Sequence, residues 1–148
     1  MRLVRRPETV ALVLIAAGAA FAALAQDLPA SDPDRAAILA AANVDPTVAL
    51  DVKRLVKTGG YAFVCTLMKG LPSVGDDGTK YPGGYWNTDG ELDVRLIVLK
   101  FADGKWTPRN LQGRFASTPD KVDCTVDHKT IETVDQIKTL YDSRSDGG

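Results

Sequence analysis

The chain has 148 residues, of which 45% are hydrophobic and 25% charged, and its formal net charge is -1 at pH 7. This length and composition are typical of a single globular domain. Residues 1–25 hold three arginines and one glutamate, a surplus of two positive charges, so the rest of the chain carries a formal charge of -3. Because an acidic domain has no surplus of cations to neutralise phosphates, we expect no nucleic-acid partner.

The first 25 residues have the pattern of a cleaved signal peptide. Three arginines precede an uncharged apolar run over residues 10–24, and residues 23–25 (Ala-Leu-Ala) form a small-x-small cleavage site. Residues 20–22 (Ala-Phe-Ala) offer an alternative site. The run is shorter than the roughly 20 residues that span a bilayer, and no cysteine follows it for lipid attachment. The sequence therefore predicts a periplasmic or secreted protein without a membrane anchor after cleavage.

The two cysteines, Cys65 and Cys124, are the only ones in the chain. In an oxidising compartment an even count in a small domain points to a disulfide. The alternatives are two free thiols or a Cys/His metal site, for which the single histidine leaves too few soft ligands. We therefore predict a Cys65–Cys124 disulfide and no metal or other cofactor.

The mature chain is expected to begin with a flexible leader over residues 26–31. Asp32 then has the position of an N-cap, with Pro33 at the first helical position, and strong helix formers continue to Ala42. Asp45-Pro46 forbids continuation of the helix.

A hairpin is predicted next. Residues 48–53 alternate apolar and polar, which indicates a half-buried strand, and residues 55–56 break the alternation, which indicates a bulge. Residues 57–60 turn into a strand over residues 61–68 that is apolar on both faces. This strand is expected to be the centre of the sheet.

Residues 71–89 form a long polar, glycine-rich connection without obvious secondary structure. A connection of this kind is often functional. It carries three aromatic residues, Tyr81, Tyr85 and Trp86. These residues either contact a protein, peptide or glycan, because aromatic side chains dominate binding hot spots, or fold back onto the core. They are the candidate binding residues of the sequence.

The second half predicts another hairpin and a last helix. Residues 92–99 alternate and then become apolar on both faces, and Asp103-Gly104 is a two-residue hairpin signal. The following strand, residues 105–114, contains Pro108, which favours a sheet edge. Residues 115–126 are expected to be irregular or to form a short strand, and apolar residues recur at helical spacing from Ile131 onward.

The order helix, hairpin, long loop, hairpin, helix predicts an α+β fold. We expect a four-stranded antiparallel sheet packed by an N-terminal and a C-terminal helix, with both helices on one face. The domain would span residues 32–142, followed by a frayed tail over residues 143–148.

No set of residues stands out as catalytic. His128 is the only histidine, and we interpret it as a surface residue near the last helix. The carboxylates of the long loop and its exit do not match a calcium-binding loop; they are Asp76, Asp77, Asp89, Glu91 and Asp93. The sequence thus favours a protein that is not an enzyme.

Three short sequence segments underlie a family resemblance. They are residues 60–64 (Gly-Tyr-Ala-Phe-Val), 91–94 (Glu-Leu-Asp-Val) and 104–106 (Gly-Lys-Trp). With the order of elements, they resemble small exported bacterial proteins of unassigned function, and the cystatin-like or NTF2-like arrangement. The resemblance covers about residues 32–114. It implies an N-terminal helix packed on a curved antiparallel sheet, and catalytic NTF2-like members use polar residues in a pocket.

These observations predict an exported, non-catalytic binding domain, with an inhibitor or immunity-type protein as a special case. Its partner would be another exported protein or a peptide, held by the sheet face or by residues 71–89. The alternative is an NTF2-like small-pocket enzyme or ligand carrier.

Overall fold

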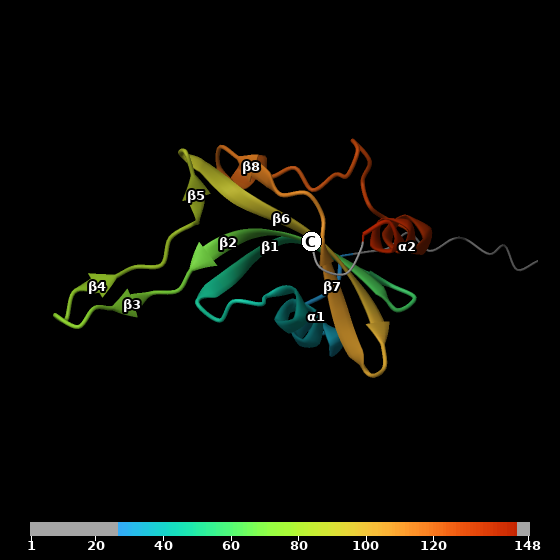
Figure 1. Ribbon diagram of the computed structural model, residues 1–148, viewed down its shortest axis with the longest axis horizontal. Coiled ribbons are helices and arrows are strands. Elements are labelled where there is room, and N and C mark those ends of the chain that lie inside the picture. The colour runs from blue at the N-terminus through green and yellow to red at the C-terminus, as the bar shows by residue number, and fades with distance from the viewer. Residues whose placement is uncertain (1–26, 145–148) are drawn as a thin grey trace, which may run out of the picture.

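The computed structural model describes residues 27–144, which form a main antiparallel sheet with a helix on each face and a separate two-stranded sheet (Figure 1). The predicted signal peptide lies outside the described residues. The elements are α1 (Asp34–Ala42), β1 (Val48–Thr58), β2 (Tyr61–Gly70), β3 (Ser73–Val74), β4 (Lys80–Tyr81), β5 (Asn87–Thr88), β6 (Glu91–Ala102), β7 (Lys105–Asn110), β8 (Arg114–Ala116), the 3-10 turn η1 (Pro119–Lys121) and α2 (Val134–Asp142). No helix within residues 27–144 is long and apolar enough to cross a membrane.

The main sheet has six strands, not the four predicted. Its order is β1-β2-β6-β5, and β7 and β8 both pair with β6. The chain enters β5 between β2 and β6, where the Trp86 N–H donates to the Met68 carbonyl (2.9 Å) and the Trp86 carbonyl accepts from Asp93 N–H (3.0 Å). The two extra strands, β5 and β8, are two and three residues long, too short to show an alternating pattern.

Both predicted hairpins are confirmed. Gly59 and Gly60 join β1 to β2 with φ of 56° and 82°, and Asp103 and Gly104 join β6 to β7 with φ of 54° and 75°. Positive φ at both central residues is the signature of the turn whose twist matches antiparallel strands. The β-bulge of β1 falls at Lys53, slightly earlier than predicted, where the register with β2 shifts.

The helices cover opposite faces of the sheet, so the prediction that they share one face was wrong. Phe63 and Leu67 of β2 belong to the core beneath α2, whereas Ala62 and Val64 belong to the core beneath α1. Both β2 and β6 are apolar on their two faces in this region. Each face therefore needs its own cover to remove apolar side chains from water.

The start of the domain is docked onto the sheet. Asp27 pairs with Val56, and the buried Leu28 donates its N–H to the Leu55 carbonyl (2.7 Å). These contacts hold part of the expected flexible leader against the edge of β1. The prediction that Asp32 is the N-cap was wrong, because α1 begins one residue later and Pro33 occupies the N-cap position. The Asp32 carboxylate still accepts from the N–H of Asp34, the first helical residue (2.8 Å).

The last helix begins later than predicted. Thr133 and Gln136 form a reciprocal capping box that starts α2 at Val134. Ile131 is buried with the core but lies in the extended chain before the helix. The predicted frayed tail is described only to Arg144, whose carbonyl accepts from the Arg109 guanidinium (2.7 Å).

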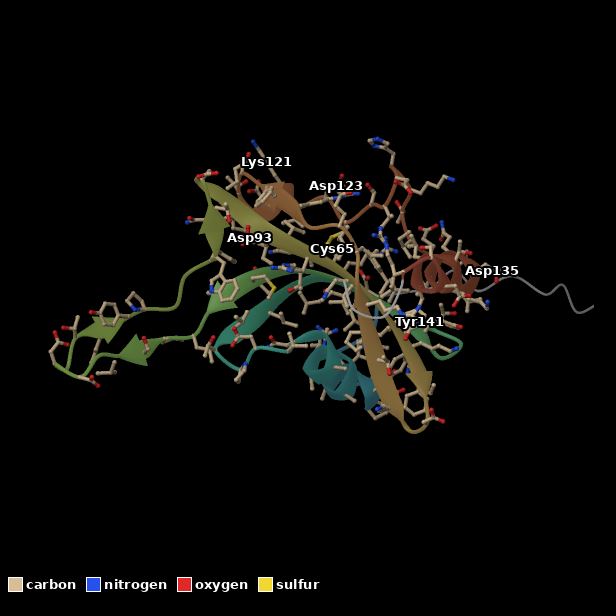
Figure 2. The ribbon with its side chains drawn as sticks, in the orientation of Figure 1. Cys65, Asp93, Lys121, Asp123, Asp135 and Tyr141 are labelled. Carbon is tan, nitrogen blue, oxygen red and sulfur yellow. A yellow bond between two sulfur atoms is a disulfide. The ribbon has the colours of Figure 1, made fainter. Side chains whose placement is uncertain are left out.

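The predicted disulfide is confirmed. Cys65 and Cys124 are bonded with a Cα–Cα distance of 5.6 Å and a sequence separation of 59 residues. Figure 2 shows Cys65 at the middle of the sheet. The bond ties the fully buried centre of β2 to the largely irregular chain before α2.

Candidate functional site

Residues 71–84 form a projection that we call the arm. Within it β3 pairs with β4, so part of the connection predicted to lack structure is a small hairpin. Figure 1 shows the arm extending away from the rest of the domain. It exposes three apolar side chains, Leu71 at 48%, Val74 at 65% and Tyr81 at 54% of their surface. None of its residues belongs to either core.

The tip of the arm is closed by local hydrogen bonds. Gly75 N–H donates to the Thr79 carbonyl (2.8 Å), and Thr79 N–H donates to the Asp77 carboxylate (2.9 Å). The hydrogen bond from the Thr79 backbone lowers the pKa of the Asp77 carboxyl below its ordinary value. The Asp77 carboxylate therefore stays ionised to a lower pH than an ordinary aspartate.

The base of the arm is narrow. Gly70 N–H donates to the Gly84 carbonyl (2.9 Å), and a Cβ on Gly83 would collide with the Gly70 carbonyl oxygen. Only a glycine permits this close approach of two backbones. The two crossing backbones fix where the arm leaves the sheet.

Tyr85 anchors the chain that returns from the arm. Its hydroxyl donates to the Asp51 carboxylate (2.8 Å), and the Lys69 ammonium lies 5.4 Å from the centre of its ring. The hydrogen bond to Asp51 raises the pKa of the Tyr85 hydroxyl. Desolvation acts to raise the pKa of Asp51, but hydrogen bonds from Lys53 and Tyr85 outweigh it, so the Asp51 pKa is lowered. This predicted binding residue folds back onto the core beneath α2.

Trp86 lies on the other face of the sheet from Tyr85. It is 37% exposed and lines a cavity of about 150 Å³ beside the C-terminal end of α1. The structure therefore separates the three predicted binding aromatics. Tyr81 lies on the arm, Tyr85 on the α2 face and Trp86 on the α1 face.

Part of the α1 face is left uncovered, and we call it the open face. The helix covers Ile97 and Leu99 of β6, but the same face continues along β6 through Arg95 and Asp93. Asp93 has an aromatic residue on each side. Its N–H donates to the Trp86 carbonyl on one side, and it pairs with Phe115 of β8 on the other. The open face consists of Met68, Trp86, Asp93, Arg95 and Phe115.

Met68, Arg95 and Phe115 are residues of the open face that the sequence did not single out, and Arg95 is the charged one. Within residues 27–144 the Arg95 side chain makes no hydrogen bond or ion pair, whereas its backbone pairs with Thr66 of β2. It lines the cavity of about 150 Å³ next to Trp86 and a second cavity of about 340 Å³ next to Phe115. The sequence indicated only that Arg95 lies on the polar side of the predicted strand 92–99. The residues around it come from other strands, and the register of those strands cannot be predicted from a local pattern.

The polar residues considered for catalysis or metal binding do not gather into one cluster. His128 is exposed in a turn with φ of 60°, next to Asp127 at 49°. Asp76 and Asp77 lie on the arm, whereas Asp93 lies in β6 at the β5 end of the sheet (Figure 2). Within the described part of the chain, no three His, Cys, Asp or Glu side chains gather closely enough to hold a metal ion.

Comparison with known proteins gives no relative. No family model, no curated protein and no solved structure matches the chain.

Proposed function

We propose that the protein is an exported, non-catalytic binding domain that holds another exported protein or a peptide through the arm. The observation that carries this proposal is the exposure of Leu71, Val74 and Tyr81 on a projection that contributes nothing to either core. The register pairs Tyr81 with Ser73 and Val74 with Lys80, so the hairpin exposes one apolar side chain on each of its faces. Such a projection suits a partner that encloses it and removes both side chains from water.

The size of the arm supports the same proposal. An isolated two-stranded hairpin is marginally stable at best in water, and β3 and β4 are each only two residues long. A partner that covered Val74 and Tyr81 would bury apolar surface and order the arm further. Tyrosine is a frequent binding hot spot because it offers a large ring and a hydroxyl with little rotational freedom to lose.

Export is supported by the disulfide, since such bonds persist in oxidising compartments, and by the predicted signal peptide. We place the mature protein in the periplasm or outside the cell. A relation to cystatin-like or NTF2-like proteins stays a proposal supported by the N-terminal helix that packs on the sheet. An inhibitor or immunity-type protein would use an arm of this kind to fill a partner's groove.

The test compares the wild type with a Val74→Ser/Tyr81→Ser variant as bait in the exported fraction of the source cells. The matched control is Val44→Ser, because Val44 is 86% exposed but lies outside the arm. We expect a partner that is retained by the control and lost by the double variant, with both melting temperatures unchanged. Binding must then be reproduced with the purified partner. A partner that the double variant retains would contradict the proposal.

A second candidate function is ligand carriage, the alternative that the NTF2-like resemblance implies. The cavity of about 150 Å³ beside Trp86 favours it, because Met68 and Ile97 line it together with Arg95, and apolar walls with a few placed polar groups are typical of small-molecule sites.

A further inference from the structure

We propose that the open face binds a small organic acid that carries a single carboxylate on an apolar or aromatic body, with Arg95 holding the carboxylate. This site is independent of the arm. It is assembled from β2, the residue before β5, β6 and β8, next to the end of α1, and it would serve as a ligand site whether or not the arm binds a partner.

The register of the sheet brings the relevant side chains together. Asp93 pairs with Phe115 of β8, and its N–H bonds to Trp86 on the opposite side, so these residues form one row across the sheet. Arg95 is two residues further along β6 on the same face. Its guanidinium therefore lies in the next row from two exposed aromatic rings.

The charge of the site selects a carboxylate. A guanidinium offers paired donors that match the two oxygens of a carboxylate, and Arg95 has no acceptor among the described residues. Asp93 accepts instead from the Thr88 hydroxyl (3.2 Å). Arg114 also lines the cavity of about 340 Å³, but its guanidinium is paired with Asp123 (3.0 Å), and Asp45 lines the cavity of about 150 Å³. Arg95 is thus the arginine of the site that is left for a ligand, and the nearby carboxylates favour a singly charged ligand over a doubly charged phosphate.

The walls of the site select an apolar body. On one side of Arg95, Met68, Trp86 and Ile97 line the cavity of about 150 Å³. On the other side, Phe115 and Gly113 line the cavity of about 340 Å³ together with Thr88, Asp93 and Arg114, so the aromatic ring is one wall of a largely polar cavity. A ligand ring on either side would replace water against an aromatic face while its carboxylate stays on the guanidinium.

Gly113 gives the second cavity its room. A Cβ built there meets only the Val94 carbonyl oxygen, at 4.0 Å, which is ordinary contact. A larger side chain can therefore be introduced without a backbone clash, and it would occupy the cavity next to Arg95. This permits a variant that blocks the site while preserving the fold.

The experiment titrates the purified mature protein with 3-phenylpropanoate and follows the fluorescence of Trp86. We expect a saturable change that Trp86→Phe abolishes, since the other tryptophan, Trp106, is only 9% exposed. The uncharged 3-phenylpropanamide and the dianion phenyl phosphate should each bind about tenfold more weakly or not at all. Arg95→Gln should weaken binding of the acid by about tenfold or more while the melting temperature stays unchanged.

Two further variants separate the site from general surface effects. Gly113→Leu should weaken binding by filling the cavity, whereas Gln112→Leu, an exposed neighbour outside both cavities, should not. Equal binding of acid and amide, or unchanged binding by Arg95→Gln, would overturn the proposal. So would tighter binding of phenyl phosphate, or binding only to peptides with a free C-terminal carboxylate. The assay contains no protein partner, so its failure would leave the proposed role of the arm untouched.

Discussion

Tyr85 and Trp86, which follow the arm in the chain, are neighbours with different roles. Tyr85 is held by Asp51 and Lys69, while the next residue, Trp86, faces the opposite side with part of its ring in solvent. Successive side chains of extended backbone point to opposite faces, so two adjacent aromatics have different surroundings. Tyr85 thus belongs to the fold and Trp86 to the open face.

The Asp51 carboxylate makes a pH-dependent contribution to stability. Its pKa in the folded protein is lowered from the ordinary value of 3.8, so its stabilising effect is present above pH 3.8 and is lost as the pH falls through the folded pKa. Asp51→Asn should lower the free energy of unfolding by less than about 1 kcal/mol at pH 7, because the pair is partly exposed. Urea unfolding at pH 7 and at successively lower pH measures this, and a difference that stays constant into strong acid would contradict the assignment.

The elements show which features of the fold are encoded locally. The hairpins at Gly59-Gly60 and Asp103-Gly104 and the helix beginning at Asp34 could be predicted because their signals are adjacent residues. The strands β5 and β8 could not, because they are short and are stabilised by pairing with a distant strand. Placement of the helices on opposite faces likewise depends on contacts between segments far apart in sequence, although the apolar faces of β2 already required two covers.

Each helix should contribute similarly to stability, because Ile38 of α1 and Ile137 of α2 are both fully buried on opposite faces. Ile38→Ala and Ile137→Ala should each lower the free energy of unfolding by about 3 kcal/mol, through lost burial and the cavity left behind. Thr139→Ala, at an exposed position of α2, is the control. If Ile38→Ala changed stability no more than the control, α1 would not form a core with the sheet.

The same difference between local and long-range information governs the candidate sites. Tyr81 could be proposed for binding from a glycine-rich segment alone, and the structure adds that it lies on a projecting hairpin. The open face could not be found in this way, because Phe115 and Trp86 are 29 residues apart in sequence. They lie on either side of Asp93 only because both segments pair with β6. Arg95 becomes noticeable only when its neighbours are known.

At the scale of the whole molecule, one covalent bond joins the sheet to the chain that leads into α2. The disulfide closes a loop of about 60 residues, which in the chain-entropy description stabilises the folded state by about 4 kcal/mol. Cys65→Ala/Cys124→Ala should lower the free energy of unfolding in urea by about that amount. A change below about 1 kcal/mol would mean that the bond adds little to a domain already held by its two cores.

The domain combines a main sheet that has a core on each face with the projecting arm and the open face. The two cores fill both faces of the sheet beneath the helices, while the arm projects away from the sheet (Figure 1). This arrangement separates stability from recognition. Residues of the arm can be changed without loss of core packing, which makes the central claim testable by substitution.

The most direct measurement places a photo-crosslinking amino acid at position 81 in the arm and, separately, at position 44. The full-length protein carrying each would be irradiated in its exported state. We predict one discrete adduct from position 81, lost when Val74→Ser is added, and none of that mass from position 44. The same adducts from both positions, or none from the arm in protein that is correctly folded and disulfide-bonded, would contradict the role of the arm in binding.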